Sequence, residues 1–333
     1  MDIKAVLYGV GAIGALIGRV AIKRGVKLVG AVDIDPAKVG KDLGIVIGLE
    51  EKLGIKISKD LGTTLSKCKP DIVLHATGSF LDRVYPQLIG AMESGADVIS
   101  TCETLAYPYY RYPKLSKLLD THAKIHDVTL LGCGINPGFI LDLLPAIMST
   151  PLIEFTFLKA TRCLDALKRR RTFQRKIGLG LTPRVWRRKY SEGEITGHVG
   201  YAESVFLIAS MMGLKMKSVE ERQEPIIAER DIKSKDVLIR EGEVAGIRGI
   251  GEGICSDGRK IIVELIALAG GDDFEEIILE GEPSIKWRSS GTPGDLATAA
   301  ILVNMIPNVL NAEAGLLTIN DVGIPSWKEL TSN

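Results

Sequence analysis

The chain has 333 residues, 46% of them hydrophobic, which is enough for two domains with their own cores and excludes a disordered protein. Its 42 Lys and Arg balance 41 Asp and Glu, so no global charge attracts nucleic acid or an anionic membrane. Five scattered cysteines without a C-x-x-C pair, no signal-peptide pattern and no apolar run near ~20 residues lead us to expect a cytoplasmic protein with a small-molecule substrate.

Strands and helices alternate in the first part of the chain. Apolar runs predict strands, and apolar residues at helical spacing predict helices, the first of which ends at Gly25. The predicted strands are residues 3–8, 26–33, 71–76, 97–100 and 128–132, and the predicted helices are 12–24, 81–94 and 109–124. This alternation predicts an α/β fold, a Rossmann-type doubly wound parallel sheet.

The pattern changes after Gly134. Longer strands joined by turns such as 256–258, with a helix near 201–212, predict a second, α+β domain on a mostly antiparallel sheet. The strands expected there include 154–162, 219–227, 236–242 and 260–269. A last apolar helix, 296–310, is expected to pack back on the first domain. The predicted domains are therefore 1–134 for dinucleotide binding, 135–291 for substrate binding and dimerisation, and 292–333 as a C-terminal helix.

A glycine-rich loop lies between the first predicted strand and the first predicted helix. Gly9 permits the tight turn, Gly11 lets the backbone approach a pyrophosphate, and Gly14 allows the helix to pack closely on the strand. The helix that starts at Ala12 and Ile13 supplies N–H donors to the phosphates. The loop predicts a dinucleotide cofactor; the alternative is a glycine turn with no ligand.

Asp33 ends the second strand, where a carboxylate accepts hydrogen bonds from both hydroxyls of a ribose. Its charge favours NAD because it repels a 2′-phosphate. Lys38 and Lys41 follow closely and can offset that repulsion, so NADP stays open. Thr77 and Gly78 end another strand and are expected over the cofactor, since ligands of open α/β sheets sit beyond the carboxyl ends of the strands.

Glu103 follows the strand 97–100, at the same edge of the predicted sheet. An acid in that position points into the cofactor crevice and suits proton transfer near neutral pH. A surface carboxylate that caps the next helix is the alternative. Position alone does not decide between the two.

A series of short motifs in a fixed order resembles the native amine dehydrogenase and 2,4-diaminopentanoate dehydrogenase family. The resemblance covers nearly the whole chain and is carried by residues 9–14, 100–103, 134–139, 170–176, 197–200, 294–298 and 304–307. It implies a dihydrodipicolinate-reductase-like two-domain fold, a homodimer, and the use of NAD or NADP to oxidise a primary amine to a ketone and ammonia, with the reverse reductive amination.

The resemblance also implies that Glu103 is the catalytic glutamate. The chemistry agrees, because an amine expels hydride only after a base has freed its nitrogen lone pair. A carboxylate also stabilises the resulting iminium cation and accepts a proton from the attacking water.

Other residues are candidates for the substrate pocket or the cofactor. Asn136 and Phe139 belong to a turn that is expected to begin a helix between the domains, although Asn136 could equally be a structural N-cap. His198 at a helix start is expected to face the substrate, with a structural role as the alternative. The resemblance makes Arg170, Arg171 and Gln174 supports of the pocket, and Asn304 is a further cofactor candidate.

No metal site is expected, because His122 and His126, four apart on a helix, lack a third ligand. Two other functions compete with amine oxidation. A reductase of C=N or C=C bonds, as in dihydrodipicolinate reductases, would carry a His-His pair and a Lys-x-Asp-x-Pro-Ser-Gly-Thr stretch, and neither is present. A non-catalytic NAD-binding redox sensor would need no acid at Glu103. The sequence does not decide whether the substrate carries a carboxylate.

Overall fold

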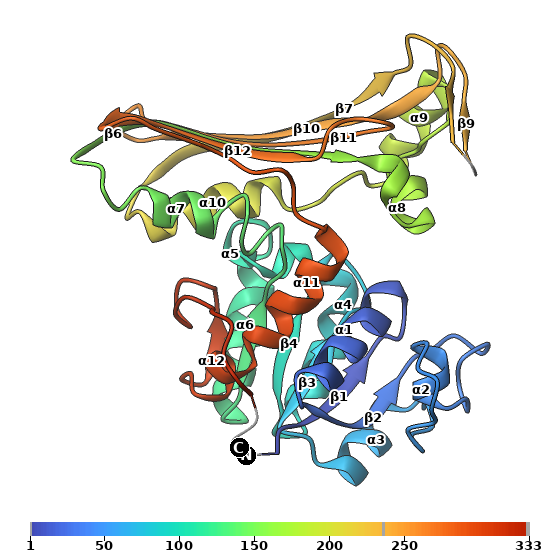
Figure 1. Ribbon diagram of the computed structural model, residues 1–333. Coiled ribbons are helices and arrows are strands. Elements are labelled where there is room, and N and C mark those ends of the chain that lie inside the picture. Colours follow the sequence, from blue (N-terminus) through green and yellow to red (C-terminus); the bar gives the residue numbers. More distant parts are fainter. Residues whose placement is uncertain (1, 235–236, 331–333) are drawn as a thin grey trace. The chain divides into compact units, whose positions relative to one another are not determined.

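The computed structural model describes residues 2–234 and 237–330, and within them the chain forms two compact units. The first unit is Met1–Gly138 together with Pro293–Asn333, and the second is Phe139–Thr292. Figure 1 shows the helices and strands of both units. The chain thus leaves the first unit once and returns to it for its C-terminal segment.

The first unit is built on a six-stranded, wholly parallel sheet with the order β14-β5-β4-β3-β1-β2. Its strands are mostly apolar, and every residue of β3 and β5 is buried, as expected for strands covered on both faces. The strands are β1 (Lys4–Tyr8), β2 (Lys27–Val32), β3 (Ile72–His75), β4 (Asp97–Ser100), β5 (Thr129–Gly132) and β14 (Gly315–Leu317). The predicted Rossmann-type sheet is confirmed.

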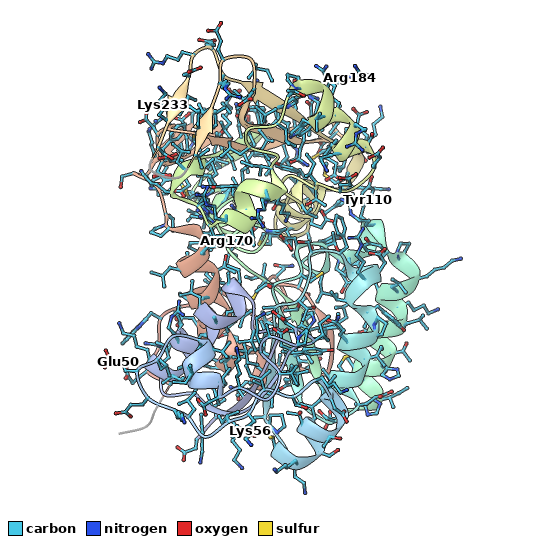
Figure 2. The ribbon with its side chains drawn as sticks, turned by 90° about the vertical axis from the view of Figure 1, so that its right-hand side faces the viewer. Glu50, Lys56, Tyr110, Arg170, Arg184 and Lys233 are labelled. Carbon is cyan, nitrogen blue, oxygen red and sulfur yellow. The ribbon has the colours of Figure 1, made fainter. Side chains whose placement is uncertain are left out.

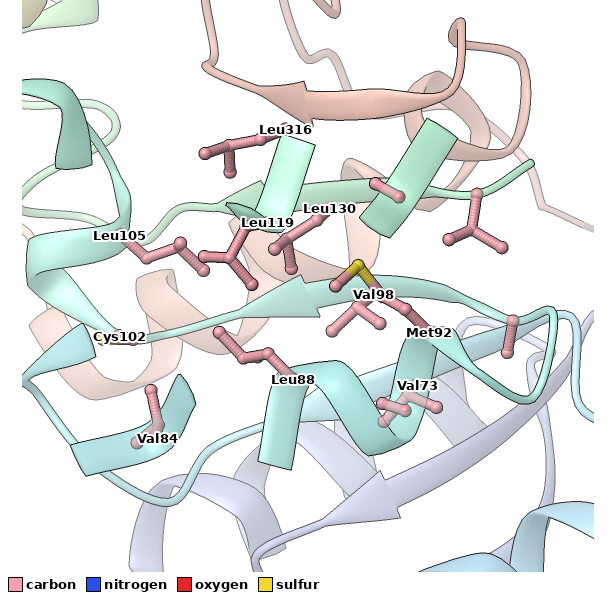
Figure 3. Packing of buried hydrophobic residues seen from close by; sticks show 14 of the residues in the cluster. Val73, Val84, Leu88, Met92, Val98, Cys102, Leu105, Leu119, Leu130 and Leu316 are labelled. Atoms are coloured by element: carbon pink, nitrogen blue, oxygen red, sulfur yellow. The ribbon is translucent and has the colours of Figure 1, made fainter. Parts of the chain in front are cut away.

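Helices pack on this sheet and on one another. They are α1 (Ala12–Lys23), α2 (Leu43–Val46), α3 (Leu61–Cys68), α4 (Leu81–Met92), the 3₁₀ turn η1 (Glu103–Leu105), α5 (Pro108–Arg111), α6 (Pro113–Ile125), α11 (Gly294–Asn304) and α12 (Ile306–Leu310). Figure 3 shows one of the buried layers, in which Leu88 and Met92 of α4, Leu119 of α6 and the strand residues Val98 and Leu130 are packed together. The C-terminal segment joins this unit through α11, which packs on α1.

The second unit is built on a six-stranded mixed sheet with the order β13-β12-β6-β11-β10-β7. Only the β6–β11 pair is parallel among its neighbouring strands, so the predicted mostly antiparallel sheet is confirmed. The strands are β6 (Glu154–Asp165), β7 (Met216–Ile227), β10 (Val244–Cys255), β11 (Lys260–Leu268), β12 (Phe274–Glu282) and β13 (Ile285–Arg288), and a small hairpin is formed by β8 (Ile232–Lys233) and β9 (Leu238–Ile239).

One face of the second sheet carries α10 (Tyr201–Met211), which Figure 1 shows beside α7 (Leu143–Met148) under the strands. Alternate residues of β10 on that face are glycines, and a Cβ on Gly249 would lie 1.9 Å from the Tyr201 hydroxyl. A Cβ on Gly251 or Gly253 would likewise meet Tyr201 or Val205 within 2.9 Å. The glycines therefore make room for the helix. The remaining helical elements are η2 (Ala166–Lys168), α8 (Arg171–Lys176) and α9 (Pro183–Ser191).

Many charged side chains are exposed on each unit, as Figure 2 shows for Glu50 and Lys56 of the first unit and for Arg184 and Lys233 of the second. Among the described residues, no helix combines the length and the apolar character needed to cross a bilayer.

Several predicted helices and strands differ from the observed ones. The helix expected at 109–124 is divided into α5 and α6, because the residue before Pro113 is disfavoured in the helical region and Tyr112 has φ −132°. The last helix is also divided, into α11 and α12, with Pro307, which has no N–H to continue the helix, in the first turn of α12.

In the second unit, the strand expected at 236–242 is wrong: only β9 forms, the chain turns at Gly242 with φ 83°, and Asp236 lies outside the described residues. The strand β10 was not predicted, because glycines weaken a strand pattern.

The helix expected to begin at residues 136–139 is also wrong. The Asn136–Pro137 peptide bond is cis and Gly138 has φ 125°, so the segment forms turns. The helix α7 starts only at Leu143, whose N–H donates to the Asp142 carboxylate 2.7 Å away.

Candidate active site

The glycine loop follows β1 and begins α1. Gly9 has φ 93°, and its N–H donates to the Val32 carbonyl at 2.8 Å. A Cβ on Gly14 would lie 1.8 Å from the Gly9 carbonyl oxygen, so the helix docks on the loop only with glycine there. A Cβ on Gly11 would meet none of the described atoms within 4 Å, which leaves open space over the start of α1. The loop therefore fits a pyrophosphate, which the first N–H groups of α1, at Ala12 and Ile13, would hold.

Asp33 follows β2 and lies beside the loop. One carboxylate oxygen accepts the Val10 N–H at 2.7 Å, and the other accepts the Asp35 N–H at 2.8 Å. The side chain is held from two sides and faces the loop, with 8% of the residue exposed. Ile34, the next residue, is 84% exposed, an apolar surface beside the position expected for the ribose.

Lys38 pairs with both neighbouring acids, 3.2 Å from Asp33 and 3.3 Å from Asp35. Partial burial works against its charge, but these two hydrogen-bonded carboxylates raise the pKa of Lys38 above its usual value. Lys41 is exposed. Of the two lysines considered as phosphate ligands, Lys38 is thus already bound by carboxylates.

The strand order places the switch point of the sheet between β1 and β3, where the chain turns from one half of the sheet to the other. The glycine loop, Thr77 with Gly78, and Glu103 follow the carboxyl ends of β1, β3 and β4, which are neighbours in the sheet. Ligands of such sheets bind at this edge. The structure therefore brings the predicted cofactor loop and the predicted catalytic acid to the same edge of one unit.

Glu103 is the first residue of η1 and is partly buried. Burial raises the pKa of the adjacent Cys102 thiol to about 12, with a further contribution from the Glu103 charge, so the two side chains lie close together. The turn is held by Thr104, whose N–H donates to the Ser79 carbonyl at 3.2 Å and whose hydroxyl accepts the Leu81 N–H at 2.8 Å. The loop that carries Glu103 is thereby attached to the loop that carries Thr77 and Gly78.

The turn at Asn136 and the helix α11 lie at the end of β5. A Cβ on Gly134 would meet the Pro137 carbonyl oxygen at 3.5 Å and the Thr298 methyl group at 3.6 Å. Thr298, which the sequence analysis did not single out, is therefore the α11 residue beside this turn. Asn304 is the last residue of α11, about 9 Å further along the helix at the usual rise.

Gln174 of the second unit is buried, and both ends of its side-chain amide form hydrogen bonds. Its amide nitrogen donates to the carbonyls of Ala166, Leu167 and Arg169 at 3.0 to 3.2 Å, and its oxygen accepts from Arg171 at 3.1 Å. Arg170, labelled in Figure 2, donates to the Thr172 hydroxyl. Gln174 thus shapes the turn before α8 and orients a nearby arginine. Phe139 is partly buried, and its carbonyl accepts the Leu144 N–H.

His198 lies before α10, in an environment that the sequence did not reveal. Burial, with the charges of Lys176, Arg162 and Arg169, lowers the pKa of His198 to about 3. Its backbone N–H donates to the Gln223 side-chain oxygen at 2.8 Å, and its ring packs edge-to-face on Tyr201. The imidazole is therefore neutral within a positively charged neighbourhood.

Two further residues of this region were missed. Gln223 on β7 also donates to the Tyr190 hydroxyl and the Thr196 carbonyl, both at 3.2 Å, and so fixes the segment before His198. Arg162 on β6 is 2% exposed, lies 3.4 Å from Glu275 and donates to the Thr292 carbonyl at 2.6 Å. Arg162 is a charged residue within the buried half of β6, which is the one signal that singles it out, whereas Gln223 lies in a strand that is polar along most of its length and gives no such signal. Within the described ranges, no group of three or more His, Cys, Asp and Glu residues is arranged to hold a metal ion.

Comparisons with known proteins identify the family. The model of the 2,4-diaminopentanoate dehydrogenase C-terminal domain matches residues 139–330. The chain is 31% identical to the 2,4-diaminopentanoate dehydrogenase of Acetoanaerobium sticklandii, covering 97% of this chain and 94% of that protein. It is 22% identical to the amine dehydrogenase of Streptomyces virginiae, covering 96% of each.

The solved amine dehydrogenase from Mycobacterium smegmatis is similar with a TM-score of 0.90 and 26% identity, over 99% of this chain and 98% of that one. These relatives favour the amine-oxidising interpretation over a C=N or C=C reductase and over a redox sensor. The chain therefore belongs to the 2,4-diaminopentanoate dehydrogenase family.

Proposed function

We propose that this enzyme oxidises a primary amine or a diamino acid such as 2,4-diaminopentanoate to the ketone and ammonia, and catalyses the reverse reductive amination. One observation carries the assignment of its catalytic group. Glu103 follows β4 at the sheet edge where the glycine loop follows β1, and its loop is hydrogen-bonded to the Thr77–Gly78 loop. A carboxylate held at that edge is placed for proton transfer beside a bound nicotinamide.

In the proposed mechanism, Glu103 has three roles. It first accepts a proton from the substrate ammonium, which frees the nitrogen lone pair. A nicotinamide dinucleotide held by the glycine loop and Asp33 would supply the acceptor for the hydride of the neighbouring carbon. Glu103 passes the ammonium proton to solvent, and its carboxylate then stabilises the cationic iminium and accepts a proton from the water that attacks it. It returns this second proton to the nitrogen of the adduct. Collapse of that adduct releases ammonia and the ketone.

For the cofactor we propose NAD in preference to NADP. Asp33 would accept the ribose hydroxyls, and Ile34 would offer its exposed side chain to the adenine. A 2′-phosphate would meet the Asp33 charge, and Lys38 is already paired with Asp33 and Asp35. Gly9, Gly11, Gly14, Thr77, Gly78 and Asn304 complete the proposed cofactor residues.

For the substrate we propose a carboxylate on the amine. Lys176, Arg162 and Arg169 place positive charge around His198, and such a neighbourhood suits an anionic group. Our proposed substrate residues are Asn136, Phe139, Gln174 and His198. Of these, Gln174 acts through Arg171, which it orients.

We further propose a cytoplasmic homodimer that associates through the second sheet. The β10 glycines face α10, so Ile250 and Ile254 project to the opposite face, and their cross-strand neighbours Ile262 and Ile266 share it. Charges between them are paired, with Glu264 2.6 Å from Arg248 and 2.7 Å from Lys159. The expected solution mass is that of a dimer, and Ile262→Asp should shift it toward the monomer in light scattering.

The function is tested by following reduction of NAD and NADP at 340 nm with 2,4-diaminopentanoate, simple alkyl amines and 2-hydroxy acids. We expect turnover with amines, ammonia as a product in equal amount to reduced cofactor, and preference for the amine that carries a carboxylate. Turnover confined to hydroxy acids, or reduction without ammonia release, would overturn the proposal.

A further inference from the structure

A buried hydrogen-bond network lies beneath the edge of the first sheet that carries Glu103. At its centre is His75, the last residue of β3, which is 0% exposed. Its Nδ1 lies 2.7 Å from the Ser100 hydroxyl, and its Nε2 lies 2.9 Å from the Gln87 oxygen and 2.8 Å from the Thr77 hydroxyl. No step of the proposed mechanism uses this imidazole.

The partners of His75 fix which of its nitrogens carries the proton. Thr77 donates its hydroxyl hydrogen to the Gln87 oxygen, so both groups near Nε2 can only accept from the ring. Nε2 therefore carries the hydrogen, and Nδ1 accepts from the Ser100 hydroxyl. Burial lowers the pKa of His75 to about 4, which keeps the ring neutral in this tautomer.

The network ends at the two loops that carry the proposed chemistry. On one side, the Ser100 oxygen accepts the Cys102 N–H at 3.1 Å, and Cys102 immediately precedes Glu103. On the other side, the ring and Gln87 hold the hydroxyl of Thr77, which precedes Gly78 at the proposed cofactor position. The His75 ring also contacts β1, because it packs edge-to-face with the ring of Tyr8, with the two centroids 5.3 Å apart.

We propose that His75 is a positioning residue whose neutral imidazole sets the backbone before Glu103 through Ser100 and, independently, the Thr77 hydroxyl at the cofactor. The proposal rests on the proposed function, because it assigns a purpose to the placement of Glu103. It goes further in predicting that the two ends of one network have separable kinetic effects. If the network only stabilised the fold, a substitution at either end would change kcat and the KM for NAD together.

Two single variants remove one end each. Ser100→Ala deletes the link to Cys102 and is expected to lower kcat about tenfold with the KM for NAD within twofold, because a small displacement of a catalytic group is costly. Gln87→Leu deletes the anchor of Thr77 and is expected to raise the KM for NAD about fivefold with kcat within twofold. If both variants change kcat and KM in the same proportion, or if neither changes either constant, the proposal is wrong.

Replacement of His75 itself gives a second test. Asparagine places an acceptor near the Nδ1 position, and glutamine places a donor near the Nε2 position. His75→Asn should therefore resemble Gln87→Leu, and His75→Gln should resemble Ser100→Ala. The same substitutions at His126, the C-cap residue of α6 ahead of β5, serve as controls and should leave both constants unchanged. If the His75 variants do not fold, the Ser100 and Gln87 variants decide alone.

Glu103→Gln separates failure of this inference from failure of the proposed function. If Glu103→Gln is inactive but the Ser100 and Gln87 variants match the wild type, Glu103 is catalytic and the positioning role is wrong. If Glu103→Gln keeps its turnover, the proposed function fails. In that case the positioning role of His75 falls with it, whatever the other variants do.

Discussion

The two units each bury a histidine, but in opposite surroundings. His75 in the first unit has hydrogen-bond partners on both ring nitrogens, supplied by neutral side chains. His198 in the second unit has cations around it from Lys176, Arg162 and Arg169. The first arrangement joins the His75 ring to Ser100, Gln87 and Thr77, and the second places cationic side chains near the His198 ring. Burial keeps both imidazoles neutral, so the two units differ in what surrounds the ring, hydrogen bonds in one and positive charge in the other.

The units also use glycine differently. In the first, Gly11 faces open space that the cofactor is expected to fill. In the second, Gly249 faces the Tyr201 ring of the same unit. Space is therefore kept for a ligand in one unit and for a helix in the other, and substitutions at the two glycines should have separate consequences.

The largest expected effect on stability is in the second unit. Gly249→Ala places a Cβ 1.9 Å from the Tyr201 hydroxyl, so the substitution should lower the free energy of unfolding by about 3 kcal/mol. Urea denaturation measures it, and the NAD affinity of the folded protein should not change. Adding Tyr201→Leu should recover part of the loss; an additive loss in the double variant would show that the contact is not the cause.

Gly11→Val should have the next largest effect, and on binding alone. Its side chain would occupy the space proposed for the pyrophosphate, so NAD affinity should fall about 100-fold, or roughly 3 kcal/mol. The urea midpoint should stay near that of the wild type, since a Cβ there meets none of the described atoms within 4 Å. Normal NAD binding by the folded variant would remove the phosphate role of this loop.

A smaller effect is expected from pH. The pKa of His75 is about 4 in the folded protein, below its usual value of 6.5, so between these values the unfolded chain binds a proton that the folded chain does not. Stability is therefore full above pH 6.5 and falls as the pH drops, by about 2 kcal/mol at pH 5.

Urea denaturation at pH 7 and pH 5 checks this, and His75→Gln should show a smaller difference between the two. His198 should also lower the stability as the pH falls, and this loss of stability continues down toward its pKa of about 3. Equal pH dependence in the wild type and in His75→Gln would mean that His75 is not buried as a neutral ring.

The sequence predicted the first unit better than the second for a physical reason. Residues 9–14 and Asp33 act through neighbours in the chain, so their spacing alone revealed the loop that the structure shows. Thr77, Gly78 and Glu103 are predicted site residues because they follow predicted strands of a parallel sheet, and the structure shows that these strands, β3 and β4, are neighbours. His75 was missed, since its partners Ser100 and Gln87 come from other elements.

In the second unit, the partners lie far apart along the chain. Arg162 lies beside Glu275, and Gln223 binds the backbone of His198, contacts that depend on strand register rather than on any local motif. The glycines of β10 hid that strand, although they are the feature that lets α10 pack on it. The turn at Asn136 was taken for the start of a helix because Asn is a common N-cap, whereas Asp142 caps the helix that forms.

The central claim is that Glu103 exchanges the protons of the amine, and a single-turnover measurement tests it most directly. Glu103→Gln should bind NAD with wild-type affinity in a fluorescence titration, and mixing its NAD complex with substrate should reduce cofactor at least 1000-fold more slowly than the wild type, about 4 kcal/mol in barrier. A burst of reduced cofactor at a rate near that of the wild type would contradict the account.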